Sequence, residues 1–217
     1  MEEKHLETPV GPVSLSVHGS GDRVVVLGHG AGSTRRYPAL VSLAEELAAS
    51  GRQAVLFNFP YSETGKRRPD APAVLEATVR VVAEHARHSL GARCLVLGGR
   101  SMGGRIASQA VAAGLAADGL VFLAYPLHPP GRPQQLRDAH LSQIAAPMLF
   151  VQGTRDDFAR PDLLEAVLKH LGDRATLHRV QDGDHSFGVL KKHGRTAEQV
   201  RAEIASALLG WLDARKL

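Results

Sequence analysis

Short apolar runs recur along the chain, and in most of them consecutive positions, rather than alternate ones, are apolar. Continuous apolarity is typical of strands that are covered on both faces, as in a parallel sheet. The runs that we expect to form strands are residues 23–27, 54–59, 94–97, 120–124, 148–151 and 175–180.

Between these runs, apolar residues recur every three or four positions, which is the spacing of one helix face. Such stripes occupy residues 40–47, 75–86, 164–171 and 200–211, and small apolar residues repeat in the same way over 106–111. Thr196 and Gln199 fit a capping box at the start of the last helix. The alternation predicts an α/β fold, with a doubly wound, mostly parallel sheet of about eight strands and helices on both faces.

The N-terminal residues differ from this pattern and predict an antiparallel hairpin at one edge of the sheet. We expect strands over residues 6–9 and 13–18, joined by a turn at Gly11 and Pro12. Residues 125–144 contain four prolines and predict a mostly irregular loop, which leaves no large cap domain. The chain has no internal repeat or linker, so we expect residues 1–217 to form one domain.

Composition and charge narrow the class of protein further. The 217 residues are 44% hydrophobic and 22% charged, as in ordinary globular proteins. The charged start, Met1 to His5, lacks a signal-peptide pattern, and no apolar stretch approaches the length of a membrane span. We therefore expect a cytoplasmic protein that does not bind membranes.

Nucleic-acid, disulfide and metal chemistry receive little support. The net charge of +4 is spread along the chain, without a basic tail or a DNA-binding motif. Cys94 is the one cysteine and lies in an apolar run, and no Cys/His spacing resembles a zinc site. We expect neither a metal nor an organic cofactor, and the oligomeric state stays open.

A glycine-flanked serine follows the run at 94–97 and is the most informative feature for chemistry. Gly99, Ser101 and Gly103 fit the G-x-S-x-G nucleophile elbow, a sharp turn between a buried strand and a helix. Because strand and helix crowd together there, the flanking positions must lack side chains. The alternative is a tightly packed turn without catalytic function. The candidate histidine and aspartate described next make this alternative less favoured.

A serine nucleophile needs a histidine base, and that base needs a carboxylate to orient it. Asp156 and Asp157 follow the run at 148–151, and His185 follows the run at 175–180. Loops that leave parallel strands at their carboxyl ends meet at one edge of the sheet. The order Ser101, Asp156, His185 matches that of α/β-hydrolases. We prefer Asp156 at the tip of a tight turn, and Asp157 remains the alternative.

An oxyanion hole is expected beside the serine. The run at 23–27 leads into His29-Gly30-Ala31-Gly32, whose small residues let backbone amides approach a tetrahedral intermediate. We expect the amides of Ala31 and Met102 to be the donors. A phosphate-binding loop is disfavoured because neither of its glycine motifs is present.

Together these motifs resemble the α/β-hydrolase superfamily. Three further segments resemble the dienelactone-hydrolase-like family that includes NSL-complex subunit 3 and testis-expressed protein 30: residues 58–61, 125–131 and 151–156. The resemblance implies an eight-stranded sheet and a Ser–Asp–His triad, and says little about substrate. Dienelactone hydrolases proper use a cysteine nucleophile, so their activity is not implied for a chain with Ser101.

The expected function is hydrolysis of small carboxylic esters or thioesters through an acyl-enzyme on Ser101. The catalytic-edge loops are rich in basic residues, which would concentrate anionic substrates. Lys66, Arg67 and Arg132 are the proposed substrate-binding residues, and the other loop cations are Arg35, Arg36, Arg68, Arg100, Arg155, Lys191 and Lys192. Acyl transfer with the same triad and a scaffold with vestigial catalysis remain the alternatives.

Overall fold

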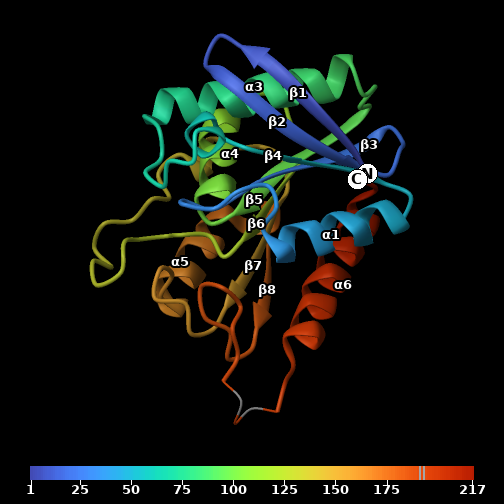
Figure 1. The fold of residues 1–217 in the computed structure, drawn as a ribbon. Helices are drawn as coiled ribbons and strands as arrows, with labels where there is room; N and C mark the ends of the chain where they lie inside the picture. Colours follow the sequence, from blue (N-terminus) through green and yellow to red (C-terminus); the bar gives the residue numbers. More distant parts are fainter. Residues whose placement is uncertain (191, 193) are drawn as a thin grey trace.

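The computed structural model describes residues 1–190, 192 and 194–217, so the expected cation Lys191 lies outside the described residues. Eight strands form one sheet in the order β1-β2-β4-β3-β5-β6-β7-β8, shown in Figure 1. The pairs β1·β2 and β2·β4 are antiparallel and all others are parallel. The strands are β1 (Glu2–Thr8), β2 (Gly11–His18), β3 (Arg23–Gly28), β4 (Gln53–Phe57), β5 (Cys94–Arg100), β6 (Gly119–Leu123), β7 (Met148–Gly153) and β8 (Ala175–Val180).

Helices cover both faces of this sheet, which confirms the predicted fold class. The helices are α1 (Pro38–Ala49), α2 (Pro60–Glu63), α3 (Pro72–His88), α4 (Met102–Ala112), α5 (Pro161–Leu171) and α6 (Ala197–Arg215). Helices α1 and α6 lie together on one face and α3, α4 and α5 lie on the other, as Figure 1 shows. Both groups of helices bury their apolar stripes against the sheet. The central strands are apolar at consecutive positions because helices cover both faces of the sheet.

Local signals explain where the helices begin. Four of them have proline at the first helical position, where its fixed φ and missing N–H carry no penalty. Helix α6 begins instead with the predicted capping box, in which Thr196 and Gln199 bond each other's backbone amides. No separate cap domain is present among the described residues, and residues 125–144 contain only the short 3-10 helix Leu141–Gln143.

The predicted N-terminal hairpin has the right strands but the wrong turn. Pro9 and Val10 form the turn, and Gly11 and Pro12 already belong to β2. The first strand also starts earlier, at Glu2, because charged residues are tolerated on an edge strand whose side chains are largely exposed. In addition, β4 ends at Phe57 and not at Phe59 as predicted. The short helix α2, which was not predicted, begins soon afterwards at Pro60.

Candidate active site

Ser101 lies in the sharp turn between β5 and α4, with the positive φ of 50° that is strained for a serine. Its amide donates to the carbonyl of Leu123 at 2.9 Å, which ties the turn to the end of β6. A Cβ atom on Gly99 or Gly103 would lie 2.1 or 2.3 Å from the carbonyl oxygen of Gly28. Neither position therefore tolerates a side chain, which is the physical reason for the motif.

His185 lies in the loop after β8 and is half-buried between the serine and the acid. Its Nε2 is 2.8 Å from Ser101 Oγ, and its Nδ1 is 2.8 Å and 3.0 Å from the two carboxylate oxygens of Asp156. An ionised carboxylate only accepts, so Nδ1 carries the proton and Nε2 accepts from the serine hydroxyl. The Phe158 ring stacks on the imidazole at 4.1 Å between centroids.

Asp156 and Asp157 have opposite environments. The Asp156 side chain is fully buried and also accepts from Gln152 Nε2 at 2.5 Å and from the Phe158 amide at 2.8 Å. Asp157 is exposed. The structure thus brings Asp156, and not Asp157, to the histidine.

The loop after β3 is held by a buried, neutral histidine. The amide of Phe59 donates to His29 Nε2 at 3.2 Å, so the protonated Nδ1 donates to the carbonyl of Gly30 at 2.8 Å. Burial lowers the pKa of His29 to about 4. Tyr61 Oη accepts from the amide of Gly32 at 3.2 Å, which fixes the far side of the loop.

These contacts leave two backbone amides beside Ser101 unused. Neither the amide of Ala31 nor that of Met102 donates to any described residue. The loop lies next to Ser101, because a Cβ atom added to Gly30 would be 3.6 Å from Ser101 Cβ. Met102 is the first residue of α4, where the N–H has no partner within the helix and the helix dipole favours negative charge.

The basic residues that we expected on the loops of this edge, here called the basic rim, are only partly available at the surface. Lys66, Arg67 and Arg132 are exposed, without an ion pair to another described residue. A Cβ atom added to Gly32 would be 3.6 Å from the carbonyl oxygen of Arg67, which puts this segment beside the loop after β3. Arg35 was wrongly predicted to be part of the rim. It is buried, and its guanidinium donates to both carboxylate oxygens of Glu3 at 3.1 and 2.9 Å.

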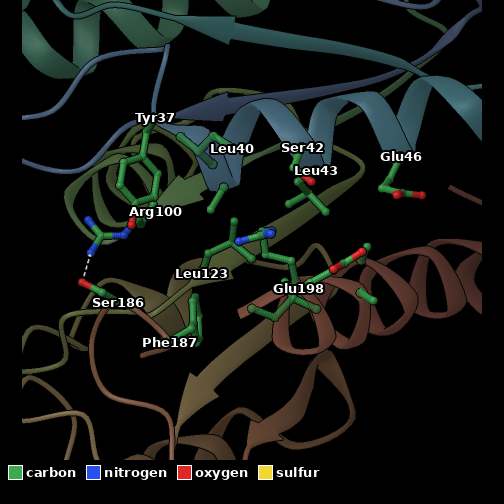
Figure 2. A pocket seen from close by; sticks show the side chains of 15 residues that line it. Tyr37, Leu40, Ser42, Leu43, Glu46, Arg100, Leu123, Ser186, Phe187 and Glu198 are labelled. Carbon is green, nitrogen blue, oxygen red and sulfur yellow. Dashed lines mark hydrogen bonds between the residues drawn. The ribbon is translucent and has the colours of Figure 1, made fainter. Parts of the chain in front are cut away.

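Arg36 is also held by Glu3, at 3.3 Å, although it remains exposed. Arg100, the residue before Ser101, is half-buried rather than free in solvent. Its Nη2 donates to Ser186 Oγ at 2.9 Å and to the His185 carbonyl at 3.3 Å, and its guanidinium packs on the Tyr37 ring (Figure 2). Arg100 thus connects the elbow to the histidine loop.

The sequence analysis missed the supporting contacts of Gln152, Phe158 and Tyr61. Gln152 ends the apolar run of β7 and bridges two loops, because its Oε1 also accepts from the Tyr125 amide at 2.8 Å. The sequence offers one signal for Gln152, because a polar residue stands there at the end of an apolar run. No pattern in the sequence points to the stacking of Phe158.

A family model described as an alpha/beta hydrolase domain matches residues 21–213. The chain belongs to the alpha/beta hydrolase family. No cluster of three potential metal ligands occurs within the described ranges. Likewise, none of the helices that the structure describes is long and apolar enough to cross a bilayer.

Solved structures of similar architecture support this assignment. An alpha-beta serine hydrolase homologue from Coxiella burnetii is 22% identical with a TM-score of 0.74, over 94% of this chain and 95% of that one. A serine hydrolase without lid from Xanthomonas campestris is 25% identical with a TM-score of 0.73, over 97% and 94%. A dienelactone hydrolase from Anabaena variabilis is 19% identical with a TM-score of 0.73, over 98% and 97%. This hydrolase therefore shares its fold with proteins described as serine hydrolases.

Proposed function

We propose that this hydrolase cleaves small carboxylic esters or thioesters through an acyl-enzyme on Ser101. The observation that carries the proposal is the continuous hydrogen-bonded chain from Ser101 Oγ through His185 to the buried Asp156 carboxylate. A serine hydroxyl bonded to a histidine that is itself oriented by a carboxylate is the arrangement that activates serine as a nucleophile.

The proposed reaction has two halves, the formation of the acyl-enzyme and its hydrolysis, and both use the same residues. Ser101 Oγ attacks the carbonyl carbon while its proton passes to His185 Nε2, and Asp156 stabilises the imidazolium. The amides of Ala31 and Met102 donate to the developing oxyanion. His185 then protonates the leaving alcohol or thiol as its bond to the acyl carbon breaks. In the second half, water gives a proton to His185 Nε2 and attacks the acyl-enzyme, and the bond between the acyl carbon and Ser101 Oγ breaks as His185 returns the proton to the serine.

The absence of a cap domain among the described residues favours small or accessible acyl groups. Lys66, Arg67 and Arg132 are proposed to favour anionic substrates, since their exposed charges lie on loops of the catalytic edge. Within the superfamily, we propose that the chain belongs to the dienelactone-hydrolase-like family that includes NSL-complex subunit 3 and testis-expressed protein 30. Members of the fold with esterase activity, such as a cold-adapted esterase from an Arctic metagenomic library, support the reaction class.

The proposal is tested by comparing the wild type with Ser101→Ala on p-nitrophenyl esters and acyl-thioesters. Loss of a triad nucleophile lowers kcat by up to about 10⁶, so the variant should be inactive although folded. Near-wild-type turnover by the variant would contradict the role of Ser101. Inactivity of both proteins toward every substrate, with and without an added acceptor alcohol or amine, would favour the scaffold alternative, and acceptor-dependent turnover would favour acyl transfer.

A further inference from the structure

A cavity lies on the α1/α6 side of the sheet and is bordered by the loop that carries His185. It has a volume of about 270 Å³ and none of Ser101, Asp156 and His185 lines it. Its walls are mostly apolar, with Leu40 and Leu43 from α1, Ile204 from α6, Leu123 from the end of β6 and Phe187 from the histidine loop (Figure 2). A hollow of this composition is suited to an apolar ligand chain.

The size of this cavity limits what it can hold. One water molecule occupies roughly 30 Å³ in the liquid, so the space corresponds to a ligand of about ten non-hydrogen atoms. A linear aliphatic chain of about seven carbons with a terminal polar group meets that limit.

Arg100 stands at one end of the cavity and supplies a cation for such a polar group. Its guanidinium is half-buried, and its described partners are a hydroxyl, a carbonyl and the face of Tyr37, with no carboxylate among them. Its Nε and Nη1 donate to no described residue, although Nη1 lies beside Gly30, where an added Cβ atom would be 2.8 Å away. A free N–H group of a guanidinium forms a charge-assisted hydrogen bond with a carboxylate oxygen.

The other end of the cavity carries the opposite charge but is more exposed. Glu46 and Glu198 lie on the side away from the Arg100 guanidinium (Figure 2), and both are exposed. Water and salt screen exposed charges. Arg201, three residues after Glu198 on α6, lines the same cavity and offsets part of that negative charge. The half-buried cation therefore determines the preferred ligand charge.

We propose that the cavity between α1 and α6 binds a small aliphatic carboxylate, with the carboxylate on Arg100 and the chain against the leucines. This site is separate from the Ser101 hydroxyl and does not depend on the proposed esterase activity. Arg100 also donates to the His185 carbonyl, so the bound carboxylate and the loop that carries His185 share one guanidinium.

The proposal is tested by isothermal titration calorimetry of the full chain with octanoate, octanol and octylammonium. Octanoate should bind about tenfold more tightly than octanol, which is the effect of one charge-assisted hydrogen bond. Arg100→Gln should remove this difference, and Arg201→Gln should largely preserve it. Absence of octanoate binding, or tighter binding of octylammonium that Glu198→Gln weakens, would overturn the proposal.

The position of the ligand is tested by filling the cavity from its exposed wall. Ala202 is exposed and lines the cavity, whereas Ser206, also exposed on α6, does not. Ala202→Phe should abolish octanoate binding, and Ser206→Phe should preserve it, with folding checked by circular dichroism. Ser42→Phe fills the space from the α1 wall and should also abolish binding. Undiminished binding in both filled variants would place octanoate elsewhere and contradict the proposal.

Discussion

At the residue scale, Asp156 and Asp157 differ in the number of donors around each carboxylate. Asp156 accepts from His185, Gln152 and the Phe158 amide with its side chain fully buried, whereas Asp157 is exposed. A buried carboxylate retains its charge only where such donors compensate for lost hydration. The three donors therefore support the proposed role of Asp156 as the acid of the triad.

Replacing the two aspartates separately tests this assignment. Asp156→Asn should lower kcat by roughly 10⁴, because the amide no longer holds the tautomer of His185 in which Nε2 accepts the serine proton. Asp157→Asn is the matched control and should change kcat little. Steady-state kinetics on one p-nitrophenyl ester measures both, and a larger loss in Asp157→Asn would move the acid role to Asp157.

The sequence points to these three residues, which the structure brings together, for a specific reason. Ser101 is marked by a motif whose glycines are sterically required, and Asp156 and His185 follow strands that end at the same edge. The contacts of Gln152, Phe158 and Tyr61 depend instead on loop conformations that no short pattern encodes.

At the element scale, the loop that follows β3 depends on a histidine that must remain neutral. His29 accepts from the Phe59 amide through Nε2, so protonation of that nitrogen breaks the contact. Burial lowers the pKa of His29 from the ordinary value of 6.5 to about 4. The unfolded chain therefore binds more protons than the folded one between these values, and stability decreases as the pH falls through this range.

The lowered pKa of His29 predicts that the free energy of unfolding depends on pH. Between pH 7 and pH 5, His29 should contribute a loss of about 2 kcal/mol in the free energy of unfolding. His29→Gln should be less stable than the wild type at pH 7, but its stability should change less over the same interval. Urea unfolding at both pH values measures this, with the exposed His88 replaced by glutamine as control. Equal pH dependence in wild type and His29→Gln would refute the burial argument.

Other elements show where sequence patterns fail. The edge strand β1 carries an alternation of exposed and half-buried residues instead of an apolar run, so its start at Glu2 was missed. Its Glu3 binds Arg35, which is 32 residues away in the chain, and this pairing removes Arg35 from the expected rim. Only the tertiary arrangement brings the two side chains together.

At the scale of the whole molecule, parallel strands bring the loops of the candidate site together from distant parts of the chain. Ser101, Asp156 and His185 follow β5, β7 and β8, whose carboxyl ends share one edge of the sheet. The exposed cations Lys66, Arg67 and Arg132 also lie on loops of this edge, and their summed field extends about 8 Å at physiological salt.

This charge distribution predicts a salt-dependent substrate preference. p-Nitrophenyl hemisuccinate should have a higher kcat/KM than the neutral butyrate ester, and the ratio should fall as ionic strength rises. Replacing Lys66 and Arg67 with glutamine should reduce the ratio. The matched control replaces Arg23 and Arg93, which are exposed near the amino ends of β3 and β5, and should leave it unchanged. An equal, salt-independent rate for both esters would show that these cations do not select substrate.

The central claim, that Ser101 is an activated nucleophile, is tested most directly by covalent labelling with a fluorophosphonate probe. The hydrogen bonds from Ser101 to His185 and from His185 to Asp156 predict a single phosphonylated residue, identified as Ser101 by peptide mass spectrometry. Labelling should be absent in Ser101→Ala and strongly reduced in His185→Ala. A folded wild-type protein that remains unlabelled, or that is labelled at another residue, would contradict the account.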